Sequence, residues 1–147
     1  MTAQPIVLVE DNPGDVELTR RALREARIAN ELVVASSGQE ALDYIFGVGE
    51  HAEREPPAIV LLDLKLPGGM PGLEVLRRIR CDKRTELLPV IVLTSSREDE
   101  DVVGSYELGA SAYVRKPLSF DKLVEVVKAL SMSWILWNES LATRRGE

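Results

Sequence analysis

The residues in this sequence that are best suited to chemistry are carboxylates placed directly after apolar runs. Asp63 ends the run "AIVLLD", and Glu10 and Asp11 follow the run "IVLV". A buried carboxylate is costly unless it is paired or binds something. Two further apolar runs lead to groups that can bind an anion, the hydroxyl of Thr94 and the ammonium of Lys116. Brought together, these side chains would form a site for a hard cation and a phosphate group.

The apolar runs themselves have the length and composition of buried strands. We expect five strands, at 6–10, 31–36, 58–63, 89–95 and 111–116. Three of the runs are almost continuously hydrophobic, which is typical of parallel strands covered on both faces. Helical patterns alternate with them, at 15–28, 38–47, 72–81, 98–108 and from 119 to at least 136. This alternation predicts right-handed βαβ units and a doubly wound α/β sheet.

The predicted sheet brings the chemical groups to one edge, because ligands of open α/β sheets bind beyond the carboxyl ends of the strands. Two carboxylates about 4 Å apart repel by roughly 4 kcal/mol at an effective dielectric constant near 20. Either some of these carboxylates are protonated or a hard divalent cation binds them, and oxygen ligands without usable Cys or His favour Mg²⁺ over zinc. With Lys116 as a second positive charge, the edge is suited to phosphoryl transfer to an aspartate nucleophile.

Composition restricts the class of protein. The chain has 147 residues, 45% of them hydrophobic, and we expect a single domain spanning 1–147. A net charge of −6 argues against a nucleic-acid-binding surface, and one cysteine excludes an internal disulfide. No apolar run reaches the roughly 18–20 residues needed to span a bilayer, and the start does not read as a signal peptide. We expect a cytoplasmic protein that binds neither nucleic acid nor membrane.

Four motifs in order resemble the receiver domain of two-component response regulators. They are "VEDN" (9–12), "LLDLKLP" (61–67), "VLTSS" (92–96) and "YVRKP" (113–117), and the similarity covers nearly the whole chain. Single-domain regulators that serve bacterial phytochromes are resembled most in two segments, "VEDNPGDVELTRRAL" and "SYELGASAYVRKP". The resemblance implies a flavodoxin-like (βα)5 fold with strand order 2-1-3-4-5.

The resemblance also implies a set of metal ligands around the acceptor. Asp63 would be the phosphoacceptor. Mg²⁺ would be bound by the side chains of Asp11 and Asp63 and by the backbone carbonyl of Lys65. Glu10 would act through an ordered water. Glu10 departs from the more usual aspartate of the family, which lengthens that side chain and puts the metal geometry in question.

The remaining family positions concern the phosphoryl group and its effect. Thr94 would donate a hydrogen bond to the phosphoryl group, Lys116 would pair with it, and Tyr113 would swing inward as a switch. The bond from Lys116 to Pro117 is cis in the family. A sensor histidine kinase, possibly a bacteriophytochrome, would supply the phosphoryl group, and a downstream protein or phosphotransfer partner would recognise the switched surface.

Two other functions remain open on the residues alone. The first is a receiver-like interaction module that works without phosphorylation, and the complete set of acids, Thr94 and Lys116 argues against it. The second is an aspartate-nucleophile phosphatase. Such enzymes usually need a second aspartate two residues after the first, and Lys65 occupies that place. We therefore expect a signalling phosphoacceptor that catalyses only its own phosphotransfer and autodephosphorylation.

The last segment of the chain is apolar beyond what the sheet needs as cover. A helical extension is expected at about 131–145, and it contains both tryptophans, Trp134 and Trp137. Extra apolar area tends to mark an interface, and tryptophan is enriched at interface hot spots. This pattern favours a homodimer through the extension and the neighbouring surface of the fifth strand. The alternative is that the segment folds back on its own domain.

Overall fold

The structure is a computed structural model that describes residues 4–95 and 108–132. The strands are β1 (Ile6–Val9), β2 (Leu32–Ala35), β3 (Ile59–Asp63), β4 (Val90–Thr94) and β5 (Ala112–Arg115). The helices are α1 (Pro13–Glu25), α2 (Gly38–Ile45), α3 (Gly72–Arg80) and α5 (Phe120–Met132), with a 3₁₀ turn, η1 (Gly49–His51). The helix predicted at 98–108 lies outside the described residues except for Leu108. The predicted extension lies outside them beyond residue 132.

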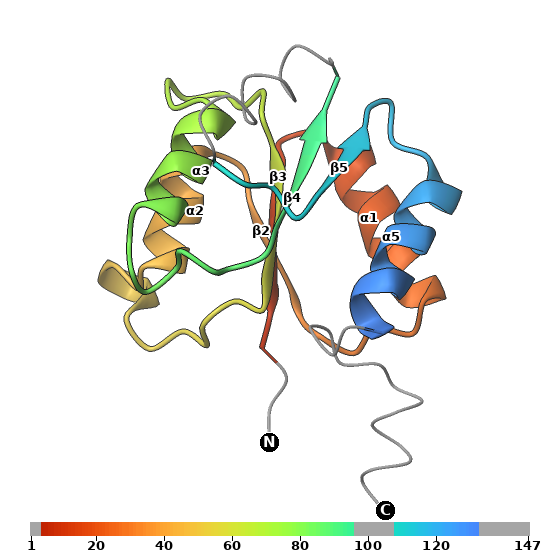
Figure 1. The fold of residues 1–147 in the computed structure, drawn as a ribbon, viewed down its shortest axis with the longest axis horizontal. Helices are drawn as coiled ribbons and strands as arrows, with labels where there is room; N and C mark the ends of the chain where they lie inside the picture. Colours follow the sequence, from red (N-terminus) through yellow and green to blue (C-terminus); the bar gives the residue numbers. More distant parts are fainter. Residues whose placement is uncertain (1–3, 96–107, 133–147) are drawn as a thin grey trace, which may run out of the picture.

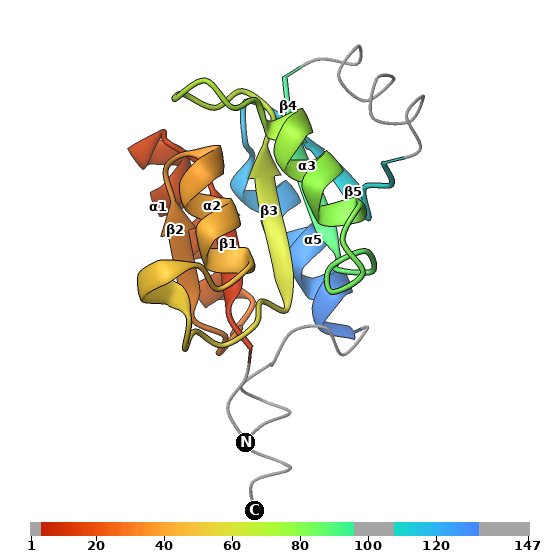
Figure 2. The ribbon, with the colours of Figure 1, turned by 90° about the vertical axis from the view of Figure 1, so that its left-hand side faces the viewer.

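The five strands form one parallel sheet in the order β2-β1-β3-β4-β5, so the predicted doubly wound fold is confirmed. Helices α1 and α5 cover one face of the sheet, and α2 and α3 cover the other (Figures 1 and 2). Each strand is shorter than predicted at one or both ends. The flanking residues still make single backbone hydrogen bonds to neighbouring strands, as Glu10 does to Ala35, so the difference is the usual uncertainty of one residue in where a strand ends.

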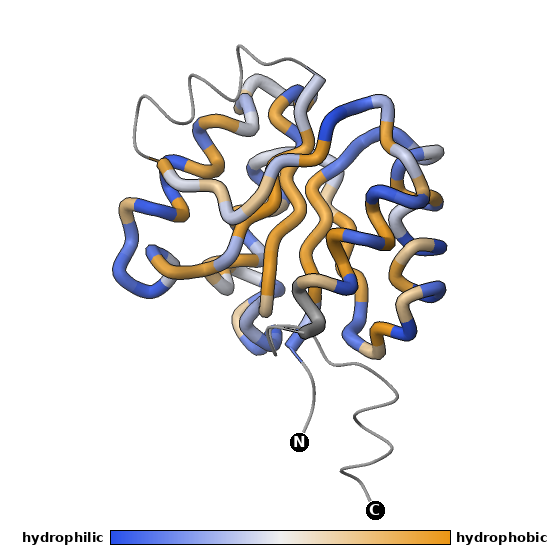
Figure 3. Tube along the Cα trace, turned by 45° about the vertical axis from the view of Figure 1, so that its right-hand side comes forward, coloured by the Kyte–Doolittle hydropathy of each residue, from blue (hydrophilic) through white to orange (hydrophobic). Residues whose placement is uncertain are grey.

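Two separate cores form because successive side chains of a strand point to opposite faces. In β3, Val60 and Leu62 face α2 and α3, whereas Ile59 and Leu61 face α1 and α5. Strands β1 and β4 alternate in the same way and are buried along their whole length. Figure 3 shows the result as hydrophobic strands in the middle of the molecule, with hydrophilic stretches on the outer sides of the helices. The carboxyl ends of the strands are thereby fixed from both sides.

Helix α1 begins two residues before its predicted start. Asn12 is the N-cap, and its side chain accepts a hydrogen bond of 3.1 Å from the backbone N–H of Asp15. Pro13 follows at the first helical position, where its missing N–H costs nothing. The helix range predicted from the sequence, 15–28, has Asp15 as its first residue. The asparagine followed by proline is the stronger signal, and it leaves Asp15 inside the first turn.

None of the described helices combines the length and the apolar composition needed to cross a membrane.

The loop from β3 to α3 is closed by a backbone contact at Gly72. Its N–H donates a 3.0 Å hydrogen bond to the carbonyl of Leu64. A Cβ at position 72 would overlap the carbonyl oxygen of Asp63 and would lie 2.5 Å from Cα of Leu64. Both are backbone atoms that cannot rotate away. Only glycine therefore allows α3 to begin this close to the end of β3.

Replacing Gly72 with alanine should push the loop away from the end of β3. We expect a loss of about 2 kcal/mol in the free energy of unfolding, typical of overpacking in a buried site. Gly69→Ala is a stringent comparison, because its φ of +85° strains an alanine although no atom lies within 4 Å of the added Cβ. Urea unfolding of both variants tests this. If Gly72→Ala is no less stable than Gly69→Ala, the overlap of the added Cβ with the backbone at the end of β3 does not limit how close α3 can begin.

Candidate functional site

Side chains from three strand ends converge at the carboxyl edge of the sheet, the upper end in Figure 1. Glu10 follows β1, Asp63 is the last residue of β3, and Lys116 follows β5. The Nζ atom of Lys116 lies 2.9 Å from Oε1 of Glu10 and 3.0 Å from Oδ2 of Asp63. The convergence predicted from the sequence is therefore present, and the lysine is its centre.

Asp63 is held by two donors and is nearly buried. Its residue is 4% exposed, its Oδ1 accepts the backbone N–H of Lys65 at 2.9 Å, and its Oδ2 accepts Lys116 Nζ. The side chain of Lys65 is exposed, and the role proposed for this residue concerns its backbone alone. The two donors orient the Asp63 carboxylate without covering it completely.

Glu10 is the most buried acid of the site, at 1% exposure. Its backbone N–H donates to the carbonyl of Ala35 on β2, and its Oε2 accepts the backbone N–H of Asn12 at 3.2 Å. Burial raises the pKa of Glu10 above its ordinary value, although the neighbouring ammonium of Lys116 opposes the shift. Its Oε1 is close to Lys116 but has no well-directed hydrogen bond from any described residue. This buried oxygen has capacity for a further electropositive partner.

Asp11 lies beside these two acids on the exposed side of the edge. One carboxylate oxygen each from Glu10, Asp11 and Asp63 lies within 4.8 Å of the others. Three hard oxygen ligands at this spacing match what Mg²⁺ or Mn²⁺ prefers. With the buried Oε1 of Glu10, the donor set fits a divalent cation of this kind.

Lys116 has a third carboxylate partner that the sequence reading missed. Its Nζ lies 3.1 Å from Oδ2 of Asp15 in the first turn of α1. Burial alone would lower the pKa of Lys116, but hydrogen bonds to Glu10, Asp63 and Asp15 outweigh burial and raise this pKa. A signal was available, since the helix after the first strand must begin at the same edge as the strand-end acids. Asp15 had been used only as a helix boundary.

Thr94 ends β4, is 1% exposed, and accepts the backbone N–H of Lys116 through its carbonyl at 2.8 Å. Tyr113 is half-buried on β5, opposite Val92 in register, and packs against the core that faces α2 and α3. The Lys116–Pro117 peptide bond is cis. The dimer candidates Trp134 and Trp137 lie outside the described residues.

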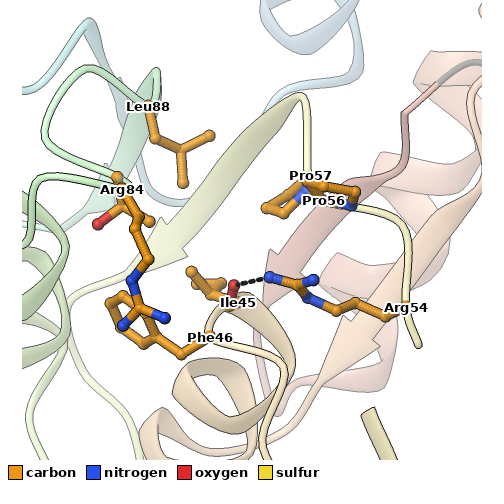
Figure 4. A pocket seen from close by; sticks show the side chains of 8 residues that line it. Ile45, Phe46, Arg54, Pro56, Pro57, Arg84 and Leu88 are labelled. Atoms are coloured by element: carbon orange, nitrogen blue, oxygen red, sulfur yellow. Dashed lines mark hydrogen bonds between the residues drawn. The ribbon is translucent and has the colours of Figure 1, made fainter. Parts of the chain in front are cut away.

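A cavity of about 210 Å³ lies far from these acids, at the opposite edge of the sheet (Figure 4). Pro56 and Pro57 line it just before β3, and Leu88 lines it just before β4. Arg54, a half-buried cation of its lining, donates to the carbonyls of Tyr44 and Ile45 at the end of α2. We assign this cavity to helix capping, not to chemistry.

Comparison with known proteins agrees with this geometry. Residues 6–128 match the response regulator receiver domain. Rcp1 of Synechocystis, described as a response regulator, is 34% identical over 130 residues, covering 88% of each chain. Its Mn²⁺-bound crystal structure has a TM-score of 0.75 at 33% identity, over 90% of this chain and 94% of that one.

Two solved structures of phytochrome response regulators are also similar. The bacteriophytochrome response regulator RtBRR is 44% identical, with a TM-score of 0.82 over 99% of this chain and 92% of that one. The phosphorylated cyanobacterial regulator RcpA is 35% identical, with a TM-score of 0.77 over 91% and 95%. The matched stretch includes every strand and all the converging acids, and the chain belongs to the response regulator receiver domain family.

Proposed function

We propose that Asp63 accepts a phosphoryl group from a sensor histidine kinase, and that this switches a protein-interaction surface. Membership of the receiver family makes the chain a two-component phosphoacceptor. The observation that supports Asp63 as the acceptor is its position between Lys116 and two further acids. Among the three clustered acids of the described residues, Asp63 alone is the last residue of a central strand, and its Oδ2 accepts a hydrogen bond from Lys116.

Mg²⁺ is the proposed cofactor. Asp11 and Asp63 would bind it through their side chains, Lys65 through its backbone carbonyl, and Glu10 through a water. Receiver domains bind Mg²⁺ or Mn²⁺ in an acidic pocket, and the fit of this donor set supports the same for this chain. When bound, the cation supplies positive charge that offsets the negative charge developing on the phosphoryl oxygens.

The step that we propose is a direct transfer. An oxygen of the Asp63 carboxylate attacks the phosphorus of a phosphohistidine, an O–P bond forms, and the N–P bond breaks with its electron pair going to the imidazole. The N–H of Lys65 keeps the carboxylate oriented. Lys116 and the hydroxyl of Thr94 stabilise charge on the phosphoryl oxygens. The phosphoryl group would draw the Thr94 hydroxyl toward Asp63. Tyr113, which packs against the core beside β4, would respond to this movement by swinging inward.

The partners follow from this function. The similarity to phytochrome response regulators supports a bacteriophytochrome as the cognate kinase. A downstream protein or phosphotransfer protein would bind the switched surface. The alternative is a receiver-like module that works without phosphorylation, and the intact acid cluster with Lys116 disfavours it.

Replacing Asp63 with asparagine should abolish phosphorylation, because an amide is not a nucleophile for this transfer. We expect no labelling by a phosphorylated histidine kinase or by a small-molecule phosphodonor in the presence of Mg²⁺. The matched control is Asp121→Asn, the same change at an exposed position in α5. Full labelling of Asp63→Asn would refute the assignment of the acceptor.

Replacing Lys116 with glutamine should leave the clustered carboxylates without their cation. We expect a loss of about 2 kcal/mol in stability without metal. The loss is smaller than for a fully buried pair, because the Lys116 side chain is 19% exposed. Mg²⁺ should then raise the Tm of the variant more than that of the wild type.

Lys122→Gln, an exposed lysine on α5, is the control for the loss of one positive charge. Thermal unfolding in EDTA and in Mg²⁺ makes both comparisons. An equal Mg²⁺ effect on Lys116→Gln and Lys122→Gln would show that Lys116 does not neutralise the metal-binding acids.

Deletion of residues 133–147 tests the proposed homodimer. If the apolar segment with Trp134 and Trp137 forms the interface, light scattering should give a dimer for the full chain and a monomer for the truncated one. Removal of 142–147 alone keeps both tryptophans and should leave the dimer. A dimer that survives loss of the tryptophans would place the interface elsewhere.

A further inference from the structure

The ammonium of Lys116 has three N–H donors, and the structure gives it three carboxylates. They belong to Glu10, Asp63 and Asp15, at 2.9, 3.0 and 3.1 Å from Nζ. A phosphoryl group on Asp63 would need one of these donors. The ammonium donates a hydrogen bond to Asp63 and forms ion pairs with Glu10 and Asp15, so a phosphoryl group would compete with these carboxylates, and at least one contact must weaken when it arrives.

Burial decides which carboxylate can leave. Glu10 is 1% exposed, and its Oε1 has no hydrogen bond from another described residue, so losing Lys116 would leave a buried oxygen uncompensated. Asp63 is itself the acceptor and stays beside the new group. The side chain of Asp15 is 24% exposed, so water can replace the ammonium there. Asp15 is therefore the partner whose release costs least.

Local hydrogen bonding explains why Asp15 is available to Lys116. An acidic side chain at the third helical position usually accepts from the N-cap N–H, in a capping box. In α1 the N-cap is Asn12, and its N–H donates instead to Oε2 of Glu10 at 3.2 Å. The Asp15 carboxylate is left to reach Lys116, while the helix N-terminus favours its negative charge.

We propose that Asp15 is a positioning residue that holds Lys116 in the unphosphorylated protein and yields it to the phosphoryl group. The proposal rests on the proposed function of Asp63. It adds that the Asp15 carboxylate competes with the phosphoryl group for the ammonium of Lys116. Asp15 lowers the affinity of the site for a phosphoryl group, because binding must first break the contact between Asp15 and Lys116. Its release also changes the first turn of α1, so phosphorylation acts on this helix as well as on the strand ends.

Beryllofluoride, which mimics a phosphoryl group on an aspartate, is the probe for this exchange. With saturating Mg²⁺, the Asp15→Asn variant should bind beryllofluoride about two- to fivefold more tightly than the wild type, in the range expected for losing a partly exposed ion pair. Glu17→Gln removes the same charge from an exposed position two residues along α1 and should bind as the wild type does. Equal affinities for all three proteins would overturn the proposal.

The NMR signal of the Lys116 ε-CH₂ group tests the exchange itself, and a merely structural role would not produce the expected pattern. Without beryllofluoride, the signal should differ between the wild type and Asp15→Asn, because only the wild type has the contact. With beryllofluoride, the two proteins should give the same signal. A difference that persists in the bound state would show that Lys116 keeps Asp15, and would overturn the proposal.

The two proposals fail in different ways. If the wild type does not bind beryllofluoride, or if the Asp63→Asn variant binds it as tightly as the wild type, the proposed phosphoacceptor is wrong. The inference about Asp15 is then wrong as well. If the wild type binds through Asp63 but Asp15→Asn matches Glu17→Gln, only the role of Asp15 is wrong.

Discussion

The site depends on one ammonium placed among several carboxylates. Lys116 lies within 3.1 Å of oxygens from Glu10, Asp15 and Asp63, and Asp11 adds a fourth acid to the same edge. Carboxylates about 4 Å apart repel by roughly 4 kcal/mol each at an effective dielectric constant near 20. A single lysine reduces this repulsion but cannot cancel it. The negative charge that the lysine does not neutralise gives the edge its affinity for a divalent cation. The lysine therefore holds the carboxylates together, and the remaining charge makes the site able to bind the metal that the reaction needs.

This arrangement needs a scaffold that does not relax when the charges repel. Strands β1, β3 and β4 are buried along their whole length between two cores, so their ends cannot move apart independently. Short contacts then fix the groups beyond the strands. Lys116 donates its backbone N–H to Thr94, and Gly72 donates to Leu64. Repulsion is therefore relieved by binding a cation and not by a change of fold, and the charge of Asp63 adds to the larger effect of burial in raising the pKa of Glu10.

The strand-end acids, the threonine and the lysine could be found from the sequence because the period of the apolar runs defines a parallel sheet, and a parallel sheet defines its active edge. For Asp15, the start of α1 at the same edge places the residue near the site but does not identify its partner. Its role depends on which acceptor takes the N–H of Asn12, a choice between Glu10 and Asp15 that is made by side-chain geometry. The predicted start of α1 is two residues too late for a related reason. An acid such as Asp15 is typical of the first turn of a helix, but the cap is Asn12.

The contacts of Lys116 also determine which elements can respond to a phosphoryl group. Its side chain joins β1, β3 and α1, and its backbone joins β5 to β4 through Thr94. Strand β2 contributes to the site only through the carbonyl of Ala35, which supports Glu10. A change in the partners of this lysine therefore acts on the α1 and β4–β5 side of the molecule, while the β2 edge keeps its hydrogen bonds. The direction in which the signal leaves the site follows from the bonds of a single residue.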